Sequence, residues 1–456
     1  NYADHRELRR ELYDAYCTRA SDQGPNAGRW DNGPVMERIL ALRHELAQLL
    51  GFRDYTEYSL ATKMADSPQQ VLDFLSDLAR RARPQAQREL DELRDFAREQ
   101  FGVEQLEVWD IGYYSEKLRQ HRYQLSQEEL RPYFPVNRVL SGLFAVAQRL
   151  FGVTIRPVEG VEVWHPDVRV YQIVDAAGSQ RGQFYLDLFA RQHKRGGAWM
   201  DGCLARRWTP AGVRLPAAYL VCNFTPPVGD DPALLTHSEV LTMFHEFGHG
   251  LHHLLTQVNY SPVAGVHGVE WDAVELPSQF LENWCWSREA LALLAEHYRT
   301  GEPLPEELYQ RMLAAKHFQA GIFMVRQLEF GLFDFRLHRE YDPARGGRVQ
   351  EVLETVRQQV AVIVPPPSNR FAHAFTHIFA GGYAAGYYSY KWAEVLSADA
   401  FSAFEENGIF DAATGARFRG SILEVGGSRP ALSSFVEFRG REPQIEPLLR
   451  LSGIAA

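Results

Sequence analysis

The pentapeptide His245-Glu246-Phe247-Gly248-His249 constrains the structure of this chain more than any other part of its sequence. In a helix, residues four apart point the same way from successive turns, so both imidazole rings can reach one Zn²⁺ at about 2.0–2.1 Å. Glu246 lies beside the first histidine but off the face that the two histidines share, where it can accept a proton from water. The pentapeptide therefore predicts a helix that carries two zinc ligands and a general base.

The residues before the pentapeptide support this interpretation. Thr236-His237-Ser238-Glu239 has the form of a capping box, so a helix is expected to begin near Thr236 and to hold both histidines in its interior. The segment 217–224 is apolar and predicts a strand ahead of that helix. The alternative is a surface helix with two solvated histidines.

A third zinc ligand is expected from elsewhere in the chain, because a catalytic zinc takes three protein ligands and leaves one position for water. The candidates are four acidic residues in one short stretch: Glu270, Asp272, Glu275 and Glu282. Asp272, Glu275 and Glu282 would share one face of a helix with Gln279. Spacing does not choose among them.

Neighbouring histidines compete with these acids. His249 and His253 form another pair four residues apart, and His252 is adjacent, but that pair lacks the neighbouring glutamate. His267, in a loop flanked by glycine, is considered as a substrate contact.

A di-iron site is a further alternative, because residues 246–249 also read Glu-x-x-His. Such a site needs a second copy of the motif. The other copy, residues 162–165, lies in a segment with strand-like alternation, which argues against it.

The rest of the chain predicts a mainly α fold with one small sheet. Ser67-Pro68 begins a helix that runs towards Gly102, with Pro84 as an expected kink, and another helix is expected at 137–152. The segment 161–190 predicts a β-hairpin around the turn at 177–179. Beyond the strand at 217–224, only helices are expected.

Composition excludes several classes of protein. The net charge of −10 and the absence of any Lys/Arg block argue against a nucleic-acid partner. No apolar run approaches the roughly 18 residues of a membrane span, and no secretory signal opens the chain. The cysteines Cys17, Cys203, Cys222 and Cys285 are scattered, as expected of reduced thiols. We therefore expect a cytoplasmic protein that does not bind a membrane.

Three stretches resemble the thimet oligopeptidase family of zinc peptidases, and the resemblance extends over nearly the whole chain. They are residues 244–253, residues 272–279 (Asp-Ala-Val-Glu-Leu-Pro-Ser-Gln) and residues 381–390, which begin Gly-Gly-Tyr. The resemblance implies that Glu275 is the third zinc ligand and that Asp272 orients a ligand imidazole. It also implies a large helical zincin-like metallopeptidase body, with a small β-sheet beside the active-site helix and a deep substrate channel.

The resemblance also implies a role for residues 381–390. A glycine-rich loop with tyrosines faces the substrate in the family, which makes Tyr383, Tyr387 and Tyr390 candidate donors to the tetrahedral intermediate, with His377 as a further candidate. A phenol is a neutral donor at pH 7 and suits this role. From the residues alone, Tyr387 and Tyr390 would be core aromatics.

The chain departs from the family at its start, where members usually carry a further helical segment, so we expect either a fragment or a trimmed relative. Region 1–152 is expected to contribute a channel wall and 153–456 to form the catalytic region, within one continuous domain. The predicted activity is zinc-dependent endopeptidase action on short oligopeptides by a monomer. The alternatives are a dipeptidyl carboxypeptidase and a catalytically silent body that binds zinc or peptide.

Overall fold

A computed structural model describes residues 2–454 and divides into two compact units. The first unit comprises Asn1–Gln124, Ala314–Lys391 and Leu449–Ala456, and the second comprises Leu125–Leu313 and Trp392–Leu448. Each unit is described by itself below. The assignment of a channel wall to residues 1–152 and of catalysis to residues 153–456 stays a prediction.

The first unit is helical. Its elements are α1 (Arg6–Cys17), α2 (Gly33–Leu49), α3 (Tyr55–Leu60), α4 (Pro68–Phe101), α5 (Val108–Tyr123), α12 (Ala320–Arg339), α13 (Val349–Val360), η4 (Phe371–Ala374), α14 (Thr376–Phe379) and the first turn of α15 (Ser389–Asn407). The short α18 (Glu446–Leu451) begins in the second unit and ends in the first.

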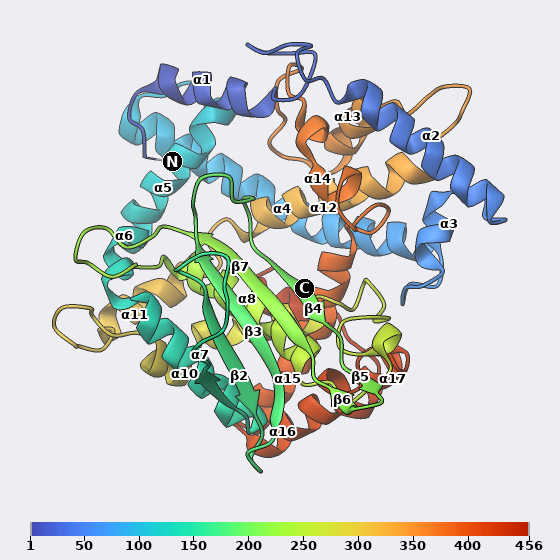
Figure 1. The fold of residues 1–456 in the computed structure, drawn as a ribbon. Helices are drawn as coiled ribbons and strands as arrows, with labels where there is room; N and C mark the ends of the chain where they lie inside the picture. The colour runs from blue at the N-terminus through green and yellow to red at the C-terminus, as the bar shows by residue number, and fades with distance from the viewer. Residues whose placement is uncertain (1, 455–456) are drawn as a thin grey trace. The chain divides into compact units, whose positions relative to one another are not determined.

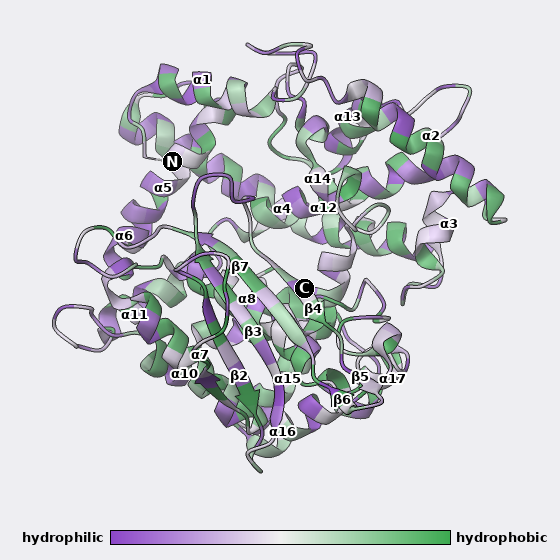
Figure 2. Cartoon of the chain, viewed as in Figure 1, coloured by the Kyte–Doolittle hydropathy of each residue, from purple (hydrophilic) through white to green (hydrophobic). Residues whose placement is uncertain are grey.

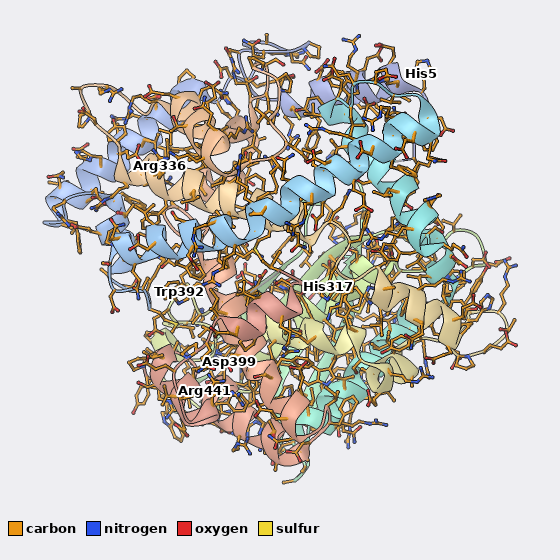
Figure 3. All side chains as sticks on the ribbon, turned by 180° about the vertical axis from the view of Figure 1, so that it is seen from behind. His5, His317, Arg336, Trp392, Asp399 and Arg441 are labelled. Carbon is orange, nitrogen blue, oxygen red and sulfur yellow. The ribbon has the colours of Figure 1, made fainter. Side chains whose placement is uncertain are left out.

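Helices α4 and α12 pack along each other and form the centre of the first unit. Ser67 caps α4 as predicted, and Gly102 ends it with a φ of +65°, which glycine adopts without steric cost. Helix α4 continues through Pro84. Figure 3 shows it as one long helix, and Figure 2 shows hydrophilic and hydrophobic residues alternating along it. The carboxylate of Glu89 accepts hydrogen bonds from the first amides of α12, at Gly321 and Ile322. These contacts fix where α12 begins.

The second unit combines helices with the sheet. Its elements are α6 (Gln127–Leu130), η1 (Arg131–Tyr133), α7 (Val136–Phe151), β1 (Thr154–Pro157), β2 (Arg169–Val174), β3 (Gln180–Phe189), β4 (Trp199–Leu204), β5 (Arg207–Thr209), β6 (Gly212–Arg214), β7 (Ala217–Phe224), α8 (His237–Leu254), η2 (Ser261–Val263), α9 (Leu276–Glu282), η3 (Asn283–Trp286), α10 (Arg288–Leu294), α11 (Glu306–Ala314), the remainder of α15, α16 (Ala412–Phe418), η5 (Arg419–Leu423) and α17 (Ala431–Arg439).

The main sheet is mixed, with strand order β1-β2-β3-β7-β4. Only β3 and β7 run parallel, and the remaining pairs are antiparallel. Helix α8 packs against β7 and β4 (Figure 1). Most side chains of β3 and β7, among them Phe184 and Leu220, are buried, so α8 packs on a largely apolar surface.

These elements confirm a mainly α fold with a small sheet. The hairpin of β2 and β3 and the strand β7 lie where the pattern predicted them. The start of the hairpin was predicted wrongly, because residues 161–168 form a loop that turns at His165-Pro166, where the amide of Val168 donates to the carbonyl of His165. Strand β1 and strands β4 to β6 were not predicted.

The cysteines and the apolarity of the helices can be compared with what composition predicted. Cys17, Cys203, Cys222 and Cys285 are free, as expected. Within residues 2–454, no helix has both the length and the apolar character that crossing a membrane would require.

Candidate metal centre

Helix α8 places two histidines on one face, as the pentapeptide predicted. Thr236 and Glu239 form the expected capping box, in which each side chain accepts a hydrogen bond from the other residue's backbone amide. The imidazole rings of His245 and His249 then lie one turn apart, with centroids 5.0 Å from each other. Local sequence is sufficient to explain this half of the site.

Glu275 completes the group from the start of α9. Its Oε2 atom lies 3.1 Å from Nε2 of His245 and 3.0 Å from Nε2 of His249. The hydroxyl of Ser278 donates to the same oxygen at 2.9 Å and so fixes the orientation of the carboxylate. Among the described residues, His245, His249 and Glu275 are the group of acidic, histidine or cysteine side chains that could hold a metal ion.

Gly248 allows α9 to come this close. A β-carbon at Gly248 would lie 2.5 Å from the carbonyl oxygen of Pro277 and 2.6 Å from Cα of Ser278. Because real β-carbons do not approach backbone atoms so closely, glycine between the two histidines is what lets Glu275 reach them.

The three ligand atoms fit zinc. Ligands of a tetrahedral Zn²⁺ at about 2.0–2.1 Å lie roughly 3.3 Å from one another, which is close to the distances between Glu275 and both rings. Burial alone would raise the pKa of Glu275, but the two histidines hold it well below its usual range, so the carboxylate is charged. Three protein ligands leave the open position of a catalytic site.

A second carboxylate orients His245. Nδ1 of His245 donates to Oε1 of Glu282 at 2.7 Å, which leaves Nε2 available for a metal. The sequence predicts Glu282 as a candidate ligand, and its spacing of seven residues from Glu275, two helical turns, is the signal that places both on one face. The expectation that Asp272 orients a ligand stays a prediction; its side chain is buried.

Glu246 lies beside the ligands but does not join them. Its side chain is buried, and its Oε2 atom has no hydrogen-bond partner within residues 2–454. Burial raises the pKa of its carboxyl, and the charges of His245 and His249 oppose that rise. A buried, unpaired carboxylate oxygen is costly and therefore points to a role in chemistry.

The rival histidines lie outside the ligand group. His252 is buried, and burial, with His249 and His253, lowers its pKa to about 3. Nε2 of His253 lies 2.9 Å from the carbonyl oxygen of Leu204 in β4. His267 is exposed, and its ring lies 5.6 Å from that of His253.

The remaining alternatives are resolved by local contacts. Glu270 accepts a hydrogen bond from the amide of Ala431 and thus has a structural role. His165, of the second Glu-x-x-His, lies in the loop before β2, with Nδ1 near Asp167.

The tyrosines predicted for the site gather in the first unit. Tyr383 stacks on Tyr390 with centroids 4.7 Å apart, and the ring of His377 lies 5.6 Å from that of Tyr387. The hydroxyl of Tyr387 donates to Oε1 of Gln327 at 3.0 Å. His377 is exposed, whereas Tyr387 is buried. The structure thus brings these four residues together; their part in catalysis stays a prediction.

A His-His-Glu centre on a mainly helical chain with a small mixed sheet is that of a zinc metallopeptidase. The comparison with known families agrees, since residues 1–454 match peptidase family M3, and the chain belongs to this family.

Similar proteins support the assignment. Oligopeptidase A of Salmonella typhimurium is 61% identical over 454 residues, which cover 99% of this chain and 67% of that protein. Dipeptidyl carboxypeptidase of Escherichia coli is 36% identical, with 98% and 65% covered. The solved structure of "PZ peptidase A with inhibitor 2" matches with a TM-score of 0.61 at 15% identity over 99% of this chain and 68% of that one, a likeness of fold. This chain spans about two thirds of the length of these relatives.

Proposed function

We propose that this metallopeptidase is an endopeptidase of short oligopeptides and that Glu246 is its general base. The observation that carries the proposal is the carboxylate of Glu246, which is buried beside three convergent zinc ligands and has an oxygen without a hydrogen-bond partner among the described residues. An oxygen in that place can accept a proton from the attacking water.

Different residues of the chain carry out different steps of the hydrolysis. His245, His249 and Glu275 would hold zinc, which when bound would supply a Lewis acid that polarises the scissile carbonyl and lowers the pKa of water. Glu246 removes one proton from the water whose oxygen bonds to the carbonyl carbon. It then delivers that proton to the amide nitrogen as the carbon–nitrogen bond breaks. Glu282 keeps His245 in the tautomer that a metal ligand requires.

Tyr383, Tyr387 and Tyr390 would donate hydrogen bonds to the developing oxyanion, with His377 as a further donor. The support is the resemblance in residues 381–390 and the clustering of the four rings. For Tyr387 the role requires its hydroxyl to leave Gln327 when substrate binds.

The experiment is cleavage of a short, internally quenched peptide by the purified chain, with zinc content measured on the same sample. We expect cleavage that o-phenanthroline abolishes. Glu246→Gln should retain zinc and lose about 10²–10⁴-fold in kcat, whereas His249→Ala should lose both zinc and activity. Full activity of Glu246→Gln would refute the assigned base, and zinc binding without any cleavage would indicate the silent binding body instead.

A dipeptidyl carboxypeptidase is the second candidate, because such a protein is among the relatives. That activity needs a free carboxylate at the end of the substrate, whereas an endopeptidase does not. We therefore expect a peptide with an amidated C-terminus to be cut as fast as the free acid, and loss of cleavage on amidation would favour the second candidate.

We also propose that the protein is a monomer in the cytoplasm. The relatives include one named as probably cytosolic and one named as chloroplastic/mitochondrial. Light scattering of the purified chain and fractionation of its source cells test the two statements.

A further inference from the structure

One buried carboxylate binds the backbone of the segment that carries the tyrosines. We call residues 381–388 the tyrosine loop. Oδ1 of Asp334 accepts a hydrogen bond from the amide of Ala385 at 2.9 Å, and Oδ2 accepts from those of Gly386 and Tyr387 at 2.8 and 2.9 Å. Asp334 belongs to α12 and has no solvent exposure. Three successive amides of the loop therefore converge on one side chain.

The loop backbone has the form that such binding requires. Ala385 has a φ of +46°, in the left-handed region that residues other than glycine seldom adopt. A left-handed residue within a turn points successive N–H groups into one concavity, an arrangement known to bind anions. The carboxylate of Asp334 is the anion here, and its hydrogen bonds offset the strain at Ala385.

His338, one turn further along α12, holds Asp334 itself, and Arg43 determines which ring nitrogen of His338 carries the proton. Nη1 of Arg43 lies 3.0 Å from Nε2 of His338, and because an arginine only donates, Nε2 must accept. The ring N–H is then at Nδ1, which lies 2.8 Å from the carbonyl oxygen of Asp334 and 3.1 Å from its Oδ1. Asp334 is therefore held by its own helix.

The loop is also held from α3. The hydroxyl of Ser59 lies within hydrogen-bond distance of the carbonyl oxygens of Ala384 and Ala385, at 3.2 and 3.0 Å. The residues around Ala385 thus have contacts to two helices of the same unit. By contrast, Gly381 and Gly382, at the other end of the loop, are exposed.

We propose that Asp334 is a positioning residue for the hydrolysis reaction. It anchors residues 385–387 to α12 and thereby determines where Tyr387 and, one turn further on, Tyr390 present their hydroxyls. This inference rests on the proposed role of the tyrosines. Asp334 would act by placing the tyrosine hydroxyls accurately, without touching the substrate itself.

The test compares two buried carboxylates of the same helix. Asp334→Asn keeps the shape but replaces one acceptor oxygen by an NH₂ group that faces backbone N–H donors. Glu329→Gln is the matched control, because Glu329 is also buried on α12 but pairs with Arg326 at 2.7 Å and with Arg357 at 2.8 Å. The full chain is used with zinc, and hydrogen exchange, zinc content, kcat and KM are measured for each variant.

We expect Asp334→Asn to accelerate exchange at the amides of residues 385–387 and to lower kcat by about 10²-fold, with zinc content unchanged and KM altered little. Glu329→Gln should leave the exchange of those amides and kcat close to the original values. Unchanged exchange or unchanged kcat in Asp334→Asn would overturn the proposal, as would an equal effect of Glu329→Gln.

A second variant and the activity of the unmodified chain ensure that each outcome supports or refutes the proposal. If Asp334→Asn does not fold, His338→Phe removes the Nδ1 donor, and faster exchange at residues 385–387 is again expected; unchanged exchange in a folded His338→Phe protein would overturn the anchor. If the unmodified chain cuts no peptide, the proposed function fails and the positioning role fails with it. Active protein with a fully active Asp334→Asn variant would refute the positioning role alone.

Discussion

Gly248 lies between the two histidine ligands and directly against the backbone of Pro277, so that a β-carbon at Gly248 would stand 2.5 Å from the Pro277 carbonyl oxygen. This close approach of α8 and α9 is what allows a glutamate at the start of one helix to meet two histidines in the interior of the other. The metal centre depends on it as much as on the ligands.

Replacing Gly248 by alanine should therefore separate the ligands. We expect Gly248→Ala to lower zinc occupancy and activity together, and to reduce the free energy of unfolding by about 1–3 kcal/mol because backbone atoms must move. Zinc analysis and denaturant unfolding measure the two effects. Gly420→Ala is the control, since nothing lies within 4 Å of its added β-carbon. Full zinc occupancy in Gly248→Ala would show that the helices can shift without cost to the site.

Loss of the partner of His245 should weaken zinc binding without removing a ligand. In Glu282→Gln the charge that favours the Nδ1–H tautomer is gone, and we expect zinc affinity to fall about 10–100-fold. Competition with a chromophoric chelator gives the affinity. Glu289→Gln, an exposed change on α10, should leave the affinity unaltered. Equal affinity in the Glu282→Gln protein would mean that the ring is held by packing alone.

Removal of zinc should lower thermal stability, because a ligand that binds the folded chain stabilises it by about 2.7 kcal/mol at a hundred times its Kd. We expect a chelator to reduce the Tm of the original protein in scanning calorimetry. The same chelator should leave the Tm of His249→Ala unchanged, since that variant already lacks a ligand. If the chelator left the Tm of the original protein unchanged, zinc binding would not contribute to thermal stability, contrary to this prediction.

Acid should weaken the second unit through Asp187, which is buried in β3 and also accepts a hydrogen bond from Trp164. Burial by itself would raise the pKa of Asp187, but hydrogen bonds from Arg191 and Lys194 lower it from 3.8 to about 2. Because the folded pKa is depressed, the stabilisation is present above pH 3.8 and is lost as the pH falls through about 2.

The expected size of this effect is about 2 kcal/mol. In urea unfolding, Asp187→Asn should be less stable than the original chain near neutral pH, and the difference should shrink as the pH is lowered below the carboxyl's usual range. The exposed Asp230→Asn serves as the control. A difference that does not change with pH would show that the carboxylate's charge is not what stabilises β3.

The tyrosine hydroxyls can be tested one at a time. We expect Tyr383→Phe and Tyr390→Phe each to lower kcat by about 10²–10³-fold with zinc retained, if each hydroxyl donates to the oxyanion. Tyr16→Phe, at an exposed position on α1, should have no effect. Undiminished kcat in a phenylalanine variant would remove that tyrosine from the proposed mechanism.

Local patterns of the sequence predict the elements whose form depends on near neighbours. The spacing of His245 and His249, the capping box at Thr236 and the cap of α4 at Ser67 depend on neighbours within one or two turns, so their consequences can be read directly from the chain. The apolar run at 217–224 likewise predicted strand β7. The hairpin began later than predicted because a turn at His165-Pro166 outweighed the alternation of side chains, and β4 has too little alternation to be recognised.

What the sequence determined by itself is the helix with two zinc ligands and Glu246, since these follow from helical geometry alone. The resemblance, rather than spacing, singled out Glu275 among four acids. Only the tertiary structure decided that Gly248 lets Glu275 approach, that Glu282 holds His245, and that Asp334 binds the tyrosine loop. Asp334 stands between two phenylalanines in an apolar run, which suggests burial but not a partner 51 residues away along the chain. Such contacts depend on how helices pack, and packing is set by the whole chain rather than by any local pattern.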